Sequence, residues 1–110
     1  MDNRIKQYLF DIENSIEDVE IFMATIQSFE EYEKDKLIKR AVEREIEIIG
    51  EAMNRILKID PEISIPEARK IVNTRNKIIH AYDEIDDVVI YVVATKHLAS
   101  LKKHIADMES

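Results

Sequence analysis

Apolar residues recur every three or four positions through the first half of the chain. This spacing places them on one face of an α-helix, because a helix completes a turn in about 3.6 residues. One stripe runs from Ile5 to Phe29 and predicts a long helix that starts at Asp2. A second stripe, from Tyr32 to Leu57, ends before a proline, which disfavours helix just upstream. The pattern therefore predicts two long helices in this half.

The second half begins with the signature of a third helix. Ser64 stands three residues before Glu67, the spacing of an N-terminal capping box, and Pro66 lies where the first turn of a helix tolerates proline. Apolar positions then continue at helical spacing to about His80-Ala81. We therefore expect a helix that begins at Ser64–Glu67 and ends at this histidine.

A fourth helix is predicted from about Asp87 to Asp107. Asp86 or Asp87 suits its N-terminal cap, and capping accounts for the nearby carboxylates better than a metal site does. The run from Val88 to Ala94 has strong β propensity, but a lone strand would have no partner and the helical spacing continues beyond it. The extra apolar residues widen this helix's hydrophobic surface, which predicts burial against a second copy of the chain.

Composition supports a small helical protein. The chain has 110 residues with one Gly, two Pro and no Cys, which excludes a disulfide-stapled module and leaves too few turn residues for a sheet-rich sandwich. We expect an all-α antiparallel bundle of four to five helices in a single domain, residues 1–110. Without Cys, thiol catalysis and thiolate metal sites are also excluded.

Neither a membrane nor a secretory location is predicted. The longest apolar run has seven residues, far fewer than the roughly 20 of a membrane-spanning helix. The N-terminus lacks the continuous apolar stretch of a secretory signal. We therefore expect a cytoplasmic protein with no membrane partner.

The net charge of −7 is unevenly distributed. Residues 1–35 hold 3 basic and 10 acidic side chains, residues 83–110 hold 3 and 6, and residues 36–82 hold 10 and 7. An acidic balance argues against extensive phosphate contacts. The distribution instead predicts an acidic scaffold around a small basic cleft.

Arg75, Asn76 and His80 form the candidate site. Asn76 and His80 are four positions apart on one helix face, and Arg75 lies about a quarter turn from Asn76. Imidazole moves protons near neutral pH and guanidinium binds phosphate through paired hydrogen bonds, so together they suit phosphoryl chemistry without a metal or cofactor. The alternative is that His80 only stabilises a helix C-terminus through the helix dipole.

Other polar positions have simpler interpretations. His97 and His104 lie seven residues apart, but nothing nearby completes a metal-ligand set, so we expect surface or interface residues. Gly50 in a helix interior costs about 1 kcal/mol relative to Ala, which indicates close approach of another backbone or side chain. Glu51 beside it either faces the candidate site and orients one of its residues or is simply exposed.

The segment from Arg75 to Tyr82 resembles the R-x-x-x-x-H-x-Y motif of HEPN-domain proteins. Within these it resembles the HepT-like toxin family, in which Asn follows the arginine. The segment Ile49-Gly50-Glu51-Ala52 is similar to that family's typical I-G-E-A segment, and Ile65-Pro66 precedes the motif helix as it does in relatives. The resemblance covers almost the whole chain.

This resemblance implies a homodimeric helical bundle with metal-independent endoribonuclease activity. In the family, the Arg and His of both protomers meet in a cleft at the dimer interface. Arg75 would bind the scissile phosphate of RNA and His80 would act as general base or acid, with Asn76 and Glu51 in support. Three further basic residues, Arg69, Lys70 and Lys77, are candidates for contact with the RNA backbone. Basic residues on an exposed helix more often serve only to keep a protein soluble.

The resemblance also implies a partner, an MntA-like nucleotidyltransferase antitoxin that transfers AMP from ATP to the motif tyrosine, here Tyr82. AMP groups there would block RNA sterically and electrostatically. Two functions therefore stay open at this point: a ribonuclease toxin, and a catalytically silent helical module that binds a nucleotidyltransferase. The intact Arg75 and His80 favour the first.

Overall fold

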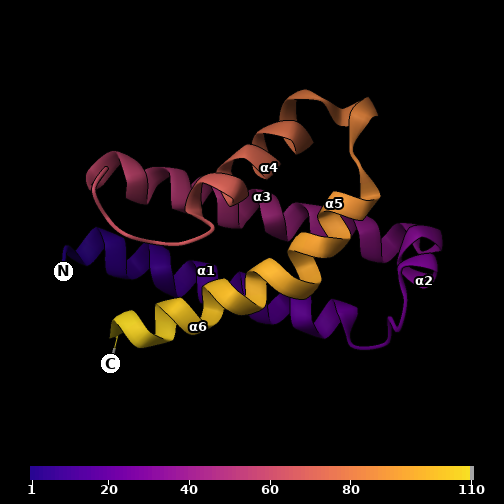
Figure 1. Ribbon diagram of the computed structural model, residues 1–110, viewed down its shortest axis with the longest axis horizontal. Coiled ribbons are helices and arrows are strands. Elements are labelled where there is room, and N and C mark those ends of the chain that lie inside the picture. The colour runs from indigo at the N-terminus through magenta and orange to yellow at the C-terminus, as the bar shows by residue number, and fades with distance from the viewer. Residues whose placement is uncertain (110) are drawn as a thin grey trace.

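Helices make up nearly all of the structure, a computed structural model that describes residues 1–109 apart from the side chain of Tyr82. No strand occurs in these residues, so the predicted all-α class is confirmed. None of the described helices is long and apolar enough to cross a membrane. In chain order (Figure 1) the elements are α1 (Asn3–Met23), α2 (Phe29–Lys34), α3 (Lys36–Ile59), α4 (Ala68–His80), a 3₁₀ turn (Tyr82–Glu84), α5 (Asp87–Val92), a π-helical turn (Val93–His97) and α6 (Leu98–Glu109).

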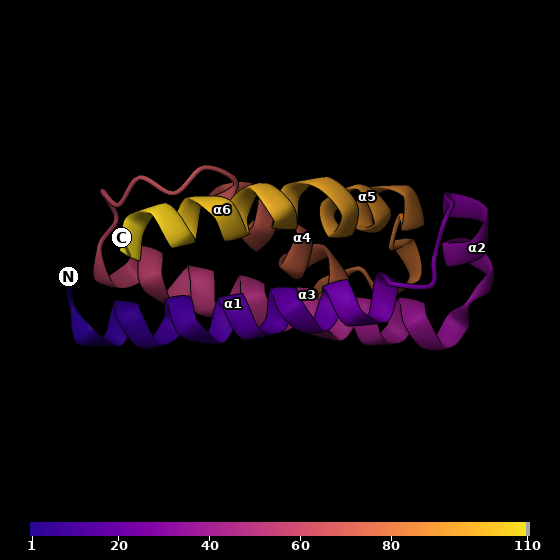
Figure 2. The same ribbon diagram turned by 90° about the horizontal axis from the view of Figure 1, so that it is seen from below.

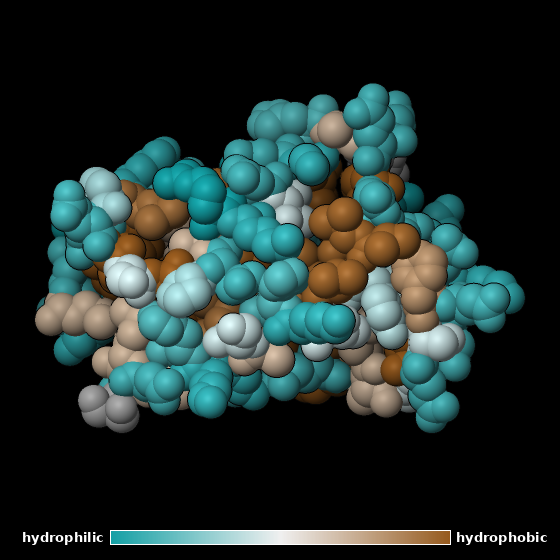
Figure 3. Space-filling model, in the orientation of Figure 1, coloured by the Kyte–Doolittle hydropathy of each residue, from teal (hydrophilic) through white to brown (hydrophobic). Residues whose placement is uncertain are grey.

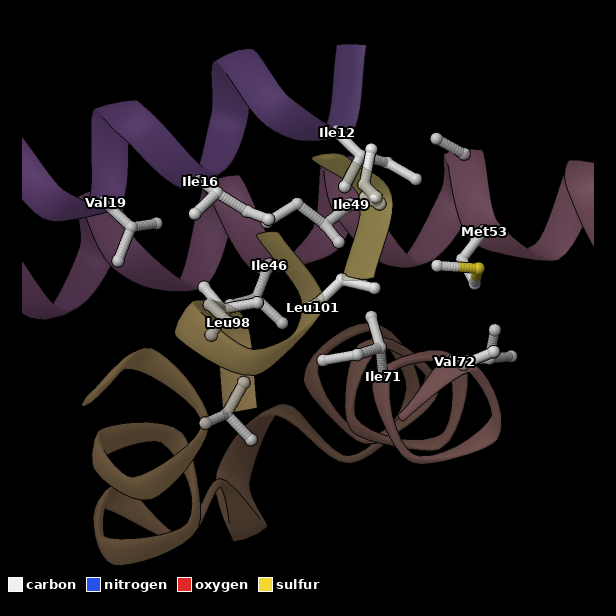
Figure 4. Close-up of a cluster of buried hydrophobic side chains, with 14 of the residues drawn as sticks. Ile12, Ile16, Val19, Ile46, Ile49, Met53, Ile71, Val72, Leu98 and Leu101 are labelled. Atoms are coloured by element: carbon white, nitrogen blue, oxygen red, sulfur yellow. The ribbon is translucent and has the colours of Figure 1, made fainter. Parts of the chain in front are cut away.

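The helices lie in two layers (Figure 2). α1 and α3 run antiparallel side by side in one layer, and α4 lies with α5 and α6 in the other. Hydrophobic side chains fill the space between the layers, as Figure 4 shows for Ile16 and Ile49 of the first layer with Ile71 and Leu98 of the second. This buried core holds α4, which carries the candidate site, against α3.

The first helix is shorter than its apolar stripe indicated. α1 begins after Asp2, whose carboxylate accepts hydrogen bonds from the first backbone N–H groups, as an N-cap should. It ends at Met23 rather than at Phe29, which belongs to α2. The prediction of a single helix over this stretch is wrong, because the apolar spacing continues across a break in the backbone.

The second apolar stripe is likewise divided between two helices. α2 begins at a variant of the capping box. Ser28 Oγ, at the N-cap, accepts a hydrogen bond from the Glu31 N–H at 3.2 Å, and the Glu31 carboxylate accepts one at 3.3 Å from the N–H of Gln27, the residue before the N-cap. Asp35 ends α2 and caps α3, since its carboxylate accepts a hydrogen bond from the Ile38 N–H at 3.0 Å. The two caps therefore divide a stripe whose spacing alone predicted one helix.

The helix with the candidate site begins later than predicted. α4 starts at Ala68, no side chain caps it, and Glu67 has a left-handed backbone with φ of 74°. The Glu67 carboxylate lies 2.5 Å from His97 Nδ1, and the Ser64 carbonyl oxygen lies 3.0 Å from His104 Nε2. The predicted capping box is wrong because these residues contact the last helical segments instead. His97 and His104 thus link the connection between α3 and α4 to the last helical segments.

The last predicted helix is confirmed as one continuous helical segment. Asp86, one of the two expected caps, accepts a hydrogen bond from the Val88 N–H at 2.9 Å and starts α5. The β-prone run is helical, and a π-helical turn from Val93 to His97 joins α5 to α6. With α5 and α6 taken as one segment, the described residues form five helices, within the predicted four to five.

Tyr32 of α2 is fully buried, and its hydroxyl has no hydrogen-bond partner among residues 1–109. Burial raises its pKa, as do the carboxylates of Glu43 and Asp87. We predict that Tyr32→Phe raises the free energy of unfolding by about 1 kcal/mol, because it removes an unsatisfied buried hydroxyl and keeps the ring. Urea denaturation measures the change. Tyr32→Leu, which also loses the ring contact with Tyr91, should lower stability, and a destabilised Tyr32→Phe would contradict this account.

Candidate functional site

α4 crosses α3 very closely at Gly50, which is buried. A Cβ atom at this position would lie 2.3 Å from Arg75 Cβ, 2.7 Å from Arg75 Cγ and 3.3 Å from the carbonyl oxygen of Ile71. Carbon atoms in contact normally stay about 3.5–4.0 Å apart. The Arg75 side chain therefore rests on bare backbone of α3, the close approach that a glycine in a helix interior indicated.

Two polar partners hold the Arg75 guanidinium. Nη2 is ion-paired with the Glu51 carboxylate, and Nη1 donates a hydrogen bond to Asn76 Oδ1 at 3.0 Å. The Arg75 side chain is 21% exposed, and its Nε is buried without a hydrogen-bond partner among the described residues. The sequence left open whether Glu51 faces the candidate site or is simply exposed. The structure shows that its carboxylate contacts Arg75.

Arg55 also contacts Glu51, and the sequence pattern did not identify it as a site residue. Its Nε donates a hydrogen bond to Glu51 Oε1 at 3.0 Å, so one carboxylate serves two arginines. Hydrogen bonds with Tyr8 and Glu51 raise the pKa of the Arg55 guanidinium. The available signal was the i, i+4 spacing of Glu51 and Arg55, which favours an ion pair on one helix face. Because such pairs are common on solvated helices, the spacing alone did not indicate a site.

A groove of about 490 Å³ opens beside these side chains, between α1, α3 and α4. Tyr8 lines it from α1, Glu51 and Arg55 from α3, and Arg75 and Ile79 from α4. Guanidinium groups in a partly enclosed groove bind phosphate through charge-assisted hydrogen bonds and stabilise negative charge that develops there. The groove is therefore suited to a phosphate-bearing ligand.

His80 lies apart from Arg75 within one chain. It is exposed at the C-terminus of α4, where it lines a separate hollow with Ile79, Ala81, Asp83 and Glu84. Five helical positions place the two side chains roughly 140° apart around the axis. Asn76 lies four positions before His80 on α4, as expected, and its side-chain oxygen accepts a hydrogen bond from Arg75.

The other predicted residues of this region are not brought into the groove. Arg69, Lys70 and Lys77 are exposed on α4, and Lys77 lines a different hollow, of about 420 Å³, between α4 and α5. The side chain of Tyr82 lies outside the described part of the structure, so only its backbone, in the 3₁₀ turn after α4, is placed. Within the described residues no group of three or more His, Cys, Asp or Glu is arranged to hold a metal ion.

The chain is similar to known proteins over most of its length. Residues 12–108 match the family HepT-like, described as "Ribonuclease HepT-like". The chain is 39% identical over 101 residues to "Probable ribonuclease HepT" of Thermococcus cleftensis, with 88% of each chain covered. It is 33% identical over 103 residues to "Putative RNase MJ1380" of Methanocaldococcus jannaschii, with 92% of this chain and 93% of the relative covered. No solved structure matches it.

Gly50→Ala tests the close crossing of α3 and α4. In an uncrowded helix this change would add about 1 kcal/mol of stability, because alanine is the better helix former. Here the new methyl group would collide with the Arg75 side chain, so we predict a net loss of about 1–3 kcal/mol.

The free energy of unfolding in urea measures the effect of Gly50→Ala, with Asn54→Ala on the same helix as the control for helix propensity. Asn54→Ala should be neutral or slightly stabilising. A stability gain for Gly50→Ala equal to that of the control would show that the crossing is looser than described.

Proposed function

The chain belongs to the HepT-like ribonuclease family, and we propose that it is an endoribonuclease that cuts RNA without a metal ion. The observation that carries this proposal is Arg75, which rests on Gly50 and is oriented by Glu51, five residues before an exposed histidine. A guanidinium fixed in this way offers preorganised positive charge to a phosphate. The ribonuclease names of the two relatives support the same activity.

The chemistry needs a proton acceptor, a proton donor and a fixed cation. One His80 imidazole takes the proton of a ribose 2′-hydroxyl, the 2′-oxygen attacks phosphorus, and a 2′,3′-cyclic phosphate forms as the 5′-oxygen leaves. A second imidazole, in its protonated form, gives its proton to that 5′-oxygen. Arg75 binds the phosphate and stabilises the charge that grows on it in the transition state.

We place this chemistry in a cleft between two copies of the chain. Arg75 and His80 point in different directions on α4, and a single imidazole does not serve as base and acid in one step, so a second copy supplies what one chain lacks. The exposed apolar surface favours such pairing: Val88 is 52% and Val89 is 37% exposed, and hydrophobic residues gather over α5 (Figure 3). Ile79, beside His80, is 42% exposed.

The proposed biological role is that of a cytoplasmic toxin held in check by an MntA-like nucleotidyltransferase. The partner would attach AMP to Tyr82, two residues after His80 and directly after the end of α4. An added nucleotide at this point brings bulk and negative charge to the place where an RNA phosphate must bind. Modification would therefore block substrate binding without unfolding the protein.

His80→Ala tests the ribonuclease proposal. We predict that it lowers the rate of RNA cleavage at least 100-fold, the low end of what general acid–base groups contribute. Cleavage of total RNA by the purified protein, with mapping of the cut ends, measures the effect, and activity should persist with a chelator present.

The matched control is His104→Gln, because the glutamine amide keeps a donor for the Ser64 carbonyl and the position lies outside both hollows of α4. It should retain activity. Loss of cleavage with chelator would reject the metal-free mechanism, and a His80→Ala protein as active as the wild type would reject the role of His80. A wild-type protein that binds the nucleotidyltransferase but cuts no RNA would support the silent module.

Tyr82→Phe tests the modification site. Incubation with the nucleotidyltransferase and ATP labelled in the α-phosphate should transfer AMP to the wild-type protein, and we predict that Tyr82→Phe abolishes this transfer, because the accepting hydroxyl is gone. Tyr91→Phe, a change of the same kind in the half-buried part of α5, is the control and should stay labelled. Full labelling of Tyr82→Phe would move the site to another residue.

A further inference from the structure

Arg55 and Arg75 both contact the Glu51 carboxylate, but they contact it through different guanidinium nitrogens. Arg75 engages both terminal nitrogens, Nη2 with Glu51 and Nη1 with Asn76. Arg55 contacts Glu51 through Nε, and its side chain is 56% exposed. Because a guanidinium carries five N–H donors and this contact uses only Nε, Arg55 keeps the N–H groups of its terminal nitrogens for a ligand. In the free protein, Arg55 is therefore the more available of the two guanidinium groups.

The charges of the groove leave these N–H groups without a strong competitor. Glu51 is divided between the two arginines, and Glu47 is ion-paired with Arg44 at 3.1 Å. Asp11 accepts a hydrogen bond from Gln7 at 3.0 Å. Two of the three carboxylates that line the groove are thus ion-paired with arginine, and the third, Asp11, accepts a hydrogen bond from a neutral amide. The three arginines of the lining, Arg44, Arg55 and Arg75, balance these three negative charges.

The groove also has the shape and lining for a nucleotide beside the site. Its volume is about 490 Å³, and its lining includes Arg75, Arg55, the aromatic residue Tyr8 and the apolar Ile79. Aromatic rings bind unstacked bases of single-stranded nucleic acid without sequence preference. Because every nucleotide carries one phosphate, a second cation in the groove that holds Arg75 is suited to the next phosphate of the same strand.

We propose that Arg55 binds the phosphate next to the scissile one, so that the groove between α1, α3 and α4 is a subsite for the flanking nucleotide of a single-stranded RNA. The terminal nitrogens of Arg55 hold two phosphate oxygens in the bidentate geometry that guanidinium favours. Glu51 holds both guanidinium groups at one carboxylate before RNA binds. This inference rests on the proposed ribonuclease function for the identity of the ligand.

Arg55 also has a purely structural interpretation, as half of an i, i+4 ion pair on an exposed helix face. Such a pair contributes about 0.2–0.5 kcal/mol to a helix and no phosphate contact. A third possibility is that Arg55 acts on RNA only through Glu51, by positioning Arg75. These alternatives differ in how RNA binding responds to salt. Affinity falls as salt rises, and every phosphate contact increases the magnitude of the slope of log K against log salt by about 0.7 for a single strand.

The test measures binding of a fluorescein-labelled 12-nucleotide single-stranded RNA by fluorescence anisotropy between 50 and 200 mM NaCl. The protein carries His80→Ala, so the RNA stays intact. Arg55→Gln, Arg75→Gln and the double variant are compared, with circular dichroism to show that each is folded. The matched control is Arg40→Gln, since Arg40 is on the same helix, is ion-paired with Glu43 and lies outside the groove.

We expect Arg55→Gln and Arg75→Gln each to lower the magnitude of this salt slope by about 0.7 and the double variant to lower it by about 1.4, because two separate phosphate contacts are lost. Arg40→Gln should leave the slope unchanged. An unchanged slope for Arg55→Gln, or a double variant no different from Arg75→Gln alone, overturns the subsite.

The binding test and the proposed function fail in different ways. If the wild-type protein cuts no RNA but Arg55→Gln still lowers the salt slope, the ribonuclease proposal fails and the phosphate subsite stands. If the wild-type protein cuts RNA and Arg55→Gln binds with an unchanged slope, the subsite fails and the ribonuclease proposal stands.

Discussion

The contact between Gly50 and the Arg75 side chain is the constraint on which the site depends. A Cβ atom on α3 at this point would lie 2.3 Å from Arg75 Cβ. Its absence lets α4 come close enough for the guanidinium to reach Glu51, the next residue on α3. A single glycine thus fixes the distance between two helices and, through it, the direction of the arginine. Its cost in helix propensity, about 1 kcal/mol, is offset by this packing.

The rest of the fold keeps α4 in that position. The core between the layers holds the apolar face of α4 against α3, and the connection before α4 is fastened to the last helical segments by His97 and His104. Glu67 adopts a left-handed backbone at this connection, a conformation that costs a non-glycine residue of the order of 1 kcal/mol. Its carboxylate lies against His97 of the π-helical turn. The α4 helix is therefore held at its N-terminus and at its crossing, while its C-terminus with His80 stays exposed.

Sequence periodicity predicted the buried residues more accurately than it predicted the ends of the helices. The stripes from Ile5 and Tyr32 are largely buried, yet α2 was missed because a stripe continues across a break that caps create. Ser28 with Glu31 and Ser64 with Glu67 have the same spacing, and only the first pair forms a variant of the capping box, since tertiary contacts with histidines engage the second. Local patterns do not contain those contacts. Arg55 shows the same limit of sequence patterns. Its ion pair with Glu51 follows from their i, i+4 spacing, but its position beside Arg75 depends on how α3 and α4 cross.

The acidic composition is compatible with a phosphate ligand because electrostatic attraction in salt water is local. At physiological ionic strength, exposed charges more than about 8 Å apart are largely screened. The 10 acidic residues in positions 1–35 therefore act weakly on a phosphate at Arg75, with Asp11 as the member of that segment that lines the groove. What the phosphate meets is a pair of arginines around one carboxylate. Binding through so few contacts depends less steeply on salt than binding along an extended basic surface. For the proposed reaction, binding through so few contacts favours release of the products, since each cut strand is held at only one or two phosphates.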